Sequence, residues 1–197
     1  VKAGISPALL DREMAGLTPD PRVTSRDSRQ PEFSQPISVY IKAAVTEGPV
    51  ATGQARRAAI PQLDAIEQRF GVPREILLAI WSRESAFGAS QGDGDVIRSM
   101  ASLAAQCRRR DWAEGELISA LRIIGSGEAT RSQLKGSWAG AMGQTQFLPS
   151  TYLSTAVDGD GDGRRDIWGS PADALASAAS LLAKGGWAPG QGWAREV

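Results

Sequence analysis

Residues 75–88 read Glu-Ile-Leu-Leu-Ala-Ile-Trp-Ser-Arg-Glu-Ser-Ala-Phe-Gly, an apolar helical pattern that carries an acidic side chain near its end. At about 3.6 residues per turn, Glu84 follows Trp81 by three positions and Leu77 by seven, so it continues the stripe that we expect to face the core. Burial favours the protonated form of a carboxyl group, and a helix end at Gly88 acts in the same direction. Two interpretations of Glu84 stay open: a general acid, or the partner of an arginine in a structural ion pair.

The composition limits the chemistry that the chain can perform. Its 197 residues, 42% of them hydrophobic, suit one globular domain with a substantial core. The 22 basic residues balance 22 acidic ones, so we expect no nucleic-acid partner. No apolar run approaches the about 20 residues of a transmembrane span. Because the chain has no histidine, Ser-His-Asp and Cys-His nucleophiles are excluded, and acid–base chemistry rests mainly on carboxyl groups.

The N-terminal part predicts a short helix followed by an irregular segment. Residues 4–16 have a helical pattern that opens at a Ser-Pro pair. Residues 18–36 hold four prolines and many polar residues, which predicts an extended segment packed over the surface. Its apolar anchors are expected to be Val23, Phe33 and the following Ile37.

Helical patterning then continues along most of the chain. It starts near residue 38 and runs to Phe70, and Pro61 should kink or divide it. Gly71 should end this part, and Pro73 should open the helix that carries Glu84.

Two further helices are predicted after a glycine-containing loop, which we expect to be mobile. Asp95 should cap a helix that runs to about residue 108, and Asp111 should cap the next one, with Leu117, Leu121 and Ile124 on one face. Cys107 should be buried as a small hydrophobe, and the run 108–110 of three arginines is interpreted as a solvated helix junction rather than a binding patch. No alternating strand pair is evident, so we predict a mainly α fold with at most a small β ribbon.

The segment 158–168, Asp-Gly-Asp-Gly-Asp-Gly-Arg-Arg-Asp-Ile-Trp, has the acidic positions and the glycine of the first half of an EF-hand loop. The usual glutamate at position 12 is missing. The ligands that we predict for a structural calcium ion are Asp158, Asp160, Asp162, the Arg164 carbonyl, Asp166 directly or through water, and Asp173 at the start of the next helix. The alternative is an Asp-Gly turn cluster whose charges are only solvated.

The segment 135–150 is rich in glycine and other small residues. Ser137, Gln144 and Gln146 offer neutral hydrogen-bonding groups, while Trp138 and Phe147 offer flat apolar faces. A sugar ring presents both hydroxyl edges and C–H faces, so these residues suit a sugar site. Tight helix packing is the alternative explanation.

Three stretches together resemble the membrane-bound lytic murein transglycosylase B family: residues 81–88, residues 136–150, and the Asp-Gly loop that closes on Asp-Ile-Trp. The resemblance runs from about Pro19 to Trp187. It implies a goose-lysozyme-like, mainly α catalytic core. It also implies cleavage of the bond between N-acetylmuramic acid and N-acetylglucosamine in peptidoglycan without water, which leaves a 1,6-anhydromuramyl end.

The resemblance also implies roles for individual residues. Glu84 matches the family's sole catalytic acid and base, and it would use the 2-acetamido oxygen of the substrate instead of a second carboxylate. The family's calcium ligands match Asp158, Asp160, Asp162, the Arg164 carbonyl and Asp173. Asp166 is the candidate substitute for Asp173. Positions that contact sugars match Ser137, Gln146 and Phe147, and the same segment supplies Gln144 and Met142 as further substrate-binding candidates.

From these observations we expect a single catalytic domain over residues 1–197. It would consist of an N-terminal wrap at 1–36, a helical core at 37–157 with the catalytic helix at 73–87, and the calcium loop and C-terminal helix at 158–197. The chain ends at Val197, before a segment that the family carries, so we expect it to be truncated. We expect a periplasmic monomer that acts on glycan strands with structural calcium and no organic cofactor, and an outer-membrane anchor in the full-length protein.

Two other functions compete with this interpretation. One is a hydrolytic muramidase in which Asp93 or Asp95 positions a water molecule. The other is a non-catalytic, calcium-stabilised module that binds peptidoglycan.

Overall fold

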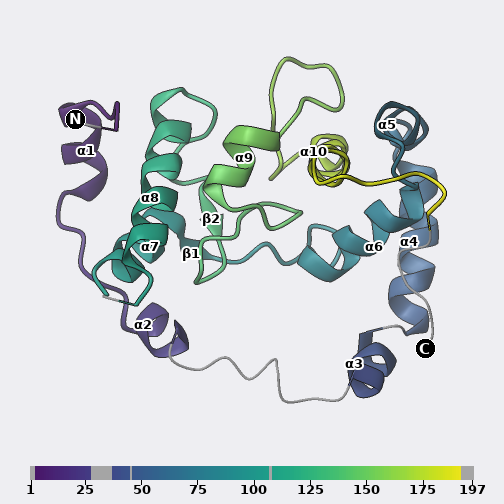
Figure 1. Cartoon of the computed structure of the whole chain (residues 1–197), viewed down its shortest axis with the longest axis horizontal. Helices are drawn as coiled ribbons and strands as arrows, with labels where there is room; N and C mark the ends of the chain where they lie inside the picture. Colours follow the sequence, from purple (N-terminus) through teal and green to yellow (C-terminus); the bar gives the residue numbers. More distant parts are fainter. Residues whose placement is uncertain (1–2, 28–36, 45, 107, 192–197) are drawn as a thin grey trace.

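The computed structural model describes residues 3–27, 37–44, 46–106 and 108–191. Within these ranges the chain folds into helices and one short β ribbon (Figure 1), which confirms the predicted mainly α class. The elements in chain order are α1 (Pro7–Met14), α2 (Pro21–Asp27), α3 (Ile37–Ala44), α4 (Glu47–Ala59), α5 (Leu63–Phe70), α6 (Arg74–Ser85), β1 (Gly94–Asp95), α7 (Val96–Ala104), α8 (Arg110–Gly125), β2 (Lys135–Gly136), α9 (Pro149–Thr155) and α10 (Pro171–Lys184).

Among the described residues, two hydrophobic clusters form the core. The α7–α8 cluster combines α7, α8 and α9 with the segment 142–147, and its largest fully buried side chains include Ile97, Met100 and Tyr152. The α6–α10 cluster joins α5, α6 and α10 around Trp81 and Leu175. Figure 1 shows α1, α7 and α8 at one end of the molecule and α4 and α5 at the other, with α6, α9 and α10 between them. The two clusters therefore meet near the middle of the molecule's long axis.

Several predicted helix boundaries are confirmed because local chemistry determines them. Pro61 lies between α4 and α5, where its ring and missing N–H interrupt the helix. Gly71 caps α5 in the left-handed region, at φ 69°, where a Cβ atom is unfavourable, and Pro73 precedes α6. The side chain of Asp95 caps α7 by accepting a hydrogen bond from the Arg98 N–H.

Other boundary predictions are wrong. The segment 18–36 contains helix α2, because Asp20 accepts the Arg22 N–H at 2.9 Å and Pro21 opens the first turn. The helix predicted to reach residue 108 ends at Ala104. Asp111 lies in the first turn of α8 and does not cap it, because α8 starts one residue earlier. Phe33 and Cys107 fall outside the described residues, as does the Ile37 side chain, whereas Val23 is buried as predicted.

The arginine run 108–110 is not simply solvated. Arg108 and Arg109 both pair with Asp27 at the end of α2, which is 4% exposed. The Arg109 guanidinium also lies 3.9 Å from the ring centroid of Trp112. These contacts hold α2 against the start of α8. Leu121 is buried and Leu117 and Ile124 pack beside it, as their spacing predicted.

The predicted β ribbon is small and antiparallel. Gly94 pairs with Gly136, and Asp95 pairs with Lys135. The ribbon places the start of the glycine-rich segment beside the loop that follows α6. Among the described residues, no helix combines the length and apolar character needed to cross a bilayer.

Candidate active site

Glu84 lies in the last turn of α6, but it does not face the core as predicted. The buried face of α6 consists of Leu77, Leu78, Trp81 and Ser85. The residue four positions after Trp81 is Ser85, and it takes the buried place in the stripe. Glu84 is one position earlier, at the edge of this face, and its side chain is exposed. A position at the edge leaves the carboxyl group accessible to a substrate.

The surroundings of Glu84 still favour its protonated form. Partial burial raises the pKa of Glu84 above the ordinary value of 4.5, and the positive charge of Arg83 opposes this effect. In the part of the chain that the structure describes, the Glu84 carboxyl group forms no hydrogen bond and no ion pair. The alternative of a structural pair with an arginine therefore finds no support among these residues.

The turn after α6 has an unusual backbone. Ala86 and Phe87 have φ values of 49° and 59°, a region that residues with a Cβ atom seldom adopt. The Ser85 hydroxyl accepts the Gly88 N–H at 2.9 Å, and the Phe87 ring packs edge-on against Trp81 at 5.4 Å between centroids. Such strain persists only where surrounding contacts hold it, and it often marks a functional site.

The glycine-rich segment folds back on itself through two isolated bridges, Gly136 with Met142 and Met142 with Phe147. A Cβ atom on Gly136 would lie 2.1 Å from the Ala141 carbonyl oxygen, so this close approach requires glycine. Met142 and Phe147 are buried in the α7–α8 cluster, at 0% and 4% exposure. They form the support of the segment rather than its surface.

The polar residues of this segment have different environments. The half-buried Ser137 hydroxyl accepts the N–H groups of Ala139 and Ala141, both at 3.2 Å. Gln146, also half-buried and at φ 52°, donates its side-chain amide to the carbonyls of Gln91 and Gly143. Gln144 is almost fully buried and contacts α6 directly, since its Oε1 accepts the Trp81 indole N–H at 2.9 Å.

The structure thus brings the end of α6 and the glycine-rich segment together. The Ser85 hydroxyl donates to the Gln144 carbonyl at 2.6 Å, and a Cβ atom on Gly88 would lie 2.7 Å from Gln144 Oε1. Trp81 and Phe87 belong to one hydrophobic cluster, and Met142 and Phe147 belong to the other. Glu84 therefore lies beside the junction between the two clusters. Sequence reasoning missed Ser85, although its spacing from Trp81 marks it as the buried position.

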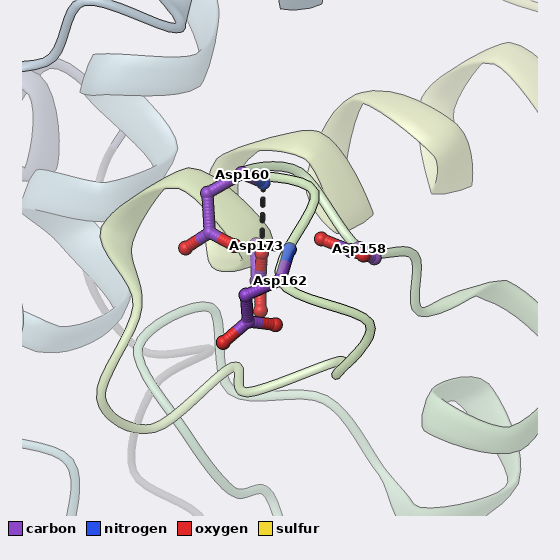
Figure 2. Close-up of side chains that lie close together, drawn as sticks. All are labelled: Asp158, Asp160, Asp162 and Asp173. Carbon is purple, nitrogen blue, oxygen red and sulfur yellow. Dashed lines mark hydrogen bonds between the residues drawn. The ribbon is translucent and has the colours of Figure 1, made fainter.

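The predicted metal loop gathers four carboxylates from distant and neighbouring positions. One oxygen from each of Asp158, Asp160, Asp162 and Asp173 lies within 4.8 Å of the others (Figure 2). Calcium takes six to eight oxygen ligands at about 2.3–2.6 Å, so oxygens on opposite sides of an ion are about 5 Å apart. Spacing and donor type in this acidic loop both fit calcium.

Backbone N–H groups hold the carboxylates of the acidic loop in place. Asp173 is fully buried; its Oδ1 accepts the Gly159 N–H at 2.8 Å and its Oδ2 accepts the Asp166 N–H at 2.7 Å. Burial raises the pKa of Asp173, against these hydrogen bonds. Hydrogen bonds from the N–H groups of Gly163 and Gly161 lower the pKa of Asp158. Backbone hydrogen bonds alone thus hold the carboxylates of Asp158 and Asp173 in position.

Two other predicted ligands have different positions. The Oδ1 of Asp166 accepts the N–H groups of Trp168 and Gly169, and Asp166 is not part of the four-carboxylate group. The Arg164 N–H donates to Asp162 at 2.8 Å, while the role of the Arg164 carbonyl stays a prediction.

Sequence reasoning also missed Glu128 and Tyr152, two residues that anchor the acidic loop through Arg165. The Arg165 guanidinium pairs with Glu128 after α8, and the Arg165 carbonyl accepts the Tyr152 hydroxyl at 3.0 Å. The partners are 37 and 13 positions away in sequence, so no local pattern indicated them.

The two carboxylates considered for a muramidase lie at β1. The Oδ1 of Asp95 accepts the Arg98 N–H and its Oδ2 pairs with Arg131 at 2.9 Å. Asp95 is therefore engaged in holding α7 and the loop before β2. Asp93 is exposed.

These features define a lysozyme-like, mainly α domain with an acidic residue at the end of its central helix. The family model described as Transglycosylase SLT domain matches residues 1–197, and the chain belongs to this family. The predicted fold class and family resemblance are both confirmed.

Three relatives illustrate the similarity. The chain is 47% identical to SltB3 from Pseudomonas aeruginosa, solved in complex with NAG-NAM-pentapeptide and with NAG-anhNAM-pentapeptide; the TM-score is 0.91 over 98% of this chain and 52% of that chain. Slt35 from Escherichia coli in complex with calcium is 30% identical, with a TM-score of 0.87 over 97% of this chain and 61% of that chain. Membrane-bound lytic murein transglycosylase B from Escherichia coli (strain K12) is 38% identical over 124 residues, 62% of this chain and 34% of that protein. The chain thus spans about half of SltB3 and about a third of the last relative.

Proposed function

We propose that this chain is a lytic transglycosylase that cleaves the β-1,4 bond between N-acetylmuramic acid and N-acetylglucosamine in peptidoglycan and leaves a 1,6-anhydromuramyl end. The observation that carries the proposal is Glu84, an accessible carboxyl group with a raised pKa and no ion pair among the described residues, held beside a strained turn. Membership of the transglycosylase family and the muropeptide complexes of SltB3 support it.

In the proposed mechanism Glu84 performs both proton transfers. As a neutral acid it donates its proton to the glycosidic oxygen while the bond from C1 to that oxygen breaks. The 2-acetamido oxygen of the substrate stabilises the positive charge at C1. The Glu84 carboxylate then removes the proton from the muramyl O6 as this oxygen attacks C1. The reaction returns Glu84 to its protonated form and requires no water and no second carboxylate.

The proposed sugar contacts lie along the glycine-rich segment. Ser137 and Gln146 are half-buried, so part of each side chain is accessible to a glycan. Phe147 and Met142 are buried and would support the segment from below. Gln144 was also a candidate contact, but its burial and its bond to Trp81 favour a structural role.

We also propose that the acidic loop binds calcium as a structural ion. The four carboxylates Asp158, Asp160, Asp162 and Asp173 would hold it, and the calcium complex of Slt35 supports the assignment. The ion would neutralise their mutual repulsion and fix the loop; it takes no part in proton transfer. No organic cofactor is needed. Because peptidoglycan is the proposed substrate, we propose a periplasmic location.

Analysis of the products tests this function. Purified peptidoglycan sacculi are digested with wild type and with Glu84→Gln, and the released muropeptides are weighed by mass spectrometry. We expect wild type to release anhydro ends, which weigh one water less than reducing ends, and Glu84→Gln to release none while its melting temperature stays near that of wild type. Exclusively reducing ends would indicate a muramidase instead. Binding of both proteins to sacculi without release would indicate the binding module.

A further inference from the structure

Each of the four polar atoms of Gln144 forms a hydrogen bond inside the protein. It is 4% exposed. Its Oε1 accepts the Trp81 indole N–H at 2.9 Å, and its Nε2 donates to the Trp168 carbonyl at 3.1 Å. Its backbone N–H donates to the Ile167 carbonyl at 2.9 Å, and its carbonyl accepts the Ser85 hydroxyl at 2.6 Å. Because the side chain is buried and these bonds hold it against α6 and the acidic loop, little of it is available for a sugar contact.

These bonds lead to two functional regions. Trp81 and Ser85 lie on α6, three positions before Glu84 and one position after it. Ile167 and Trp168 form the last part of the acidic loop, residues 158–168. Gln144 thus contacts α6 at residues before and after Glu84, and it also contacts the last residues of the acidic loop.

A continuous set of hydrogen bonds extends from Gln144 to Asp173, one of the proposed calcium ligands. The Asp166 N–H donates to the Oδ2 of Asp173 at 2.7 Å, and the Oδ1 of Asp166 accepts the Trp168 N–H at 3.1 Å. Fixing the Asp173 carboxylate therefore also restrains the backbone of residues 166–168, in which the carbonyls of Ile167 and Trp168 accept hydrogen bonds from Gln144.

We propose that Gln144 is a positioning residue that couples the acidic loop to α6 and so sets the position of Glu84. The consequence for catalysis rests on the proposed transglycosylase activity; the coupling itself rests only on the proposed calcium site. A bound cation would act on Glu84 through this side chain, by a physical network whose parts are in direct contact.

The coupling is measured without any reaction by NMR, from two quantities. The first is the Trp81 signal in a two-dimensional spectrum of the indole N–H groups, and the second is the titration midpoint of the Glu84 carboxyl signal. The Trp81 signal is assigned from its loss in Trp81→Phe. In calcium-loaded wild type, chelation should shift the Trp81 indole signal and the Glu84 titration midpoint. In Gln144→Met, which keeps side-chain length but lacks the amide, the indole signal should move upfield and chelation should change neither quantity.

Two further variants complete the design. Ser102→Ala removes a buried hydrogen bond between α7 and the Asp20 N–H, so it should lower stability and leave the Trp81 signal and the Glu84 titration unchanged. Gln144→Glu keeps an acceptor for Trp81 but lacks the donor to Trp168. It should keep the Trp81 signal and lose the response to chelation, which preserves the test if Gln144→Met does not fold.

Activity is a separate readout. Since small displacements of a catalytic group lower the rate much more than binding, we expect Gln144→Met to reduce kcat about tenfold with KM changed less than about twofold. A wild-type Trp81 signal and Glu84 titration that do not respond to chelation, or that respond equally in Gln144→Met, would overturn the coupling, even if wild type releases anhydro products. Wild type without anhydro products would overturn the proposed function, even if the NMR coupling is present.

Discussion

At the scale of single residues, the chemistry of Glu84 depends on its place at the edge of the buried stripe. A carboxyl group inside the core would be protonated but unreachable, and a fully solvated one would ionise at its ordinary pKa. Ser85 occupies the buried position and leaves Glu84 at the boundary, where it is exposed and still partly desolvated. The sequence alone predicted the raised pKa, but it predicted a deeper position than the structure shows.

The activity should depend on pH through the protonated form of Glu84. Burial raises its pKa above 4.5, so the acid form persists above that pH and activity should fall as pH rises through the raised pKa. Arg83→Gln removes the positive charge that lowers this pKa, so the falling limb of kcat/KM should move to higher pH. Anhydro-product release measured between pH 4 and 9 tests this, with Arg69→Gln on α5 as the control. A limb that stays in place or moves to lower pH in Arg83→Gln contradicts the assignment.

At the scale of elements, the sequence predicts helix ends that depend on local chemistry but not helices that depend on long-range contacts. Gly71 and Asp95 act on backbone groups within a few positions, so their roles can be recognised from sequence. Helix α2 also depends on partners far along the chain: the Asp20 N–H donates to Ser102, 82 positions away, and Asp27 pairs with Arg108. No pattern within residues 18–36 reveals these partners, so this segment was predicted to be extended.

The anchoring of α2 should weaken in acid. The hydrogen bonds from Arg22 lower the pKa of Asp20 from 3.8 to about 2. A lowered carboxyl pKa stabilises the fold above the unfolded value of 3.8, and this contribution is lost as pH falls through about 2. Asp20→Asn should therefore melt below wild type at pH 7, and the difference should shrink below about pH 4.

Thermal melting between pH 2 and 7 measures this effect, with Asp11→Asn as a control. Asp11 is an exposed residue of α1, so its variant has the same change in charge without the carboxylate contacts to Arg22 and Arg98. An Asp20→Asn deficit that is constant across this range would show that the carboxylate charge does not anchor α2.

At the scale of the whole molecule, the candidate site combines parts that are each recognisable in sequence but whose connection is not. Glu84, the glycine-rich segment and the acidic loop have local motifs because each needs particular residue types at fixed spacing. Gln144 lies in the glycine-rich segment and bonds both to α6, which carries Glu84, and to the end of the acidic loop, although its amide is equally suited to a sugar. Its buried position arises only when the two hydrophobic clusters pack together, so sequence could name the residue without giving its role.

Calcium should stabilise the whole fold, because the acidic loop joins α9 to α10 and the ion would bind only where the four carboxylates are already gathered. Binding to the folded state alone contributes about 2.7 kcal/mol at a free concentration of 100 times Kd. For a chain of this size about 1 kcal/mol shifts Tm by about 2–4 °C, so we expect a rise of about 5–10 °C, measured by calorimetry in calcium and in chelator.

Asp162→Asn isolates the ion from the rest of the fold. Asp162 is exposed, and its carboxylate accepts the Arg164 N–H, a bond that an asparagine oxygen can still accept. The variant should melt near wild type in chelator, because removing one of four like charges offsets the small loss of hydrogen bonding. It should lose most of the rise in calcium, while Asp93→Asn, exposed and outside the loop, should keep it. An equal calcium response in Asp162→Asn and wild type would show that the ion binds elsewhere.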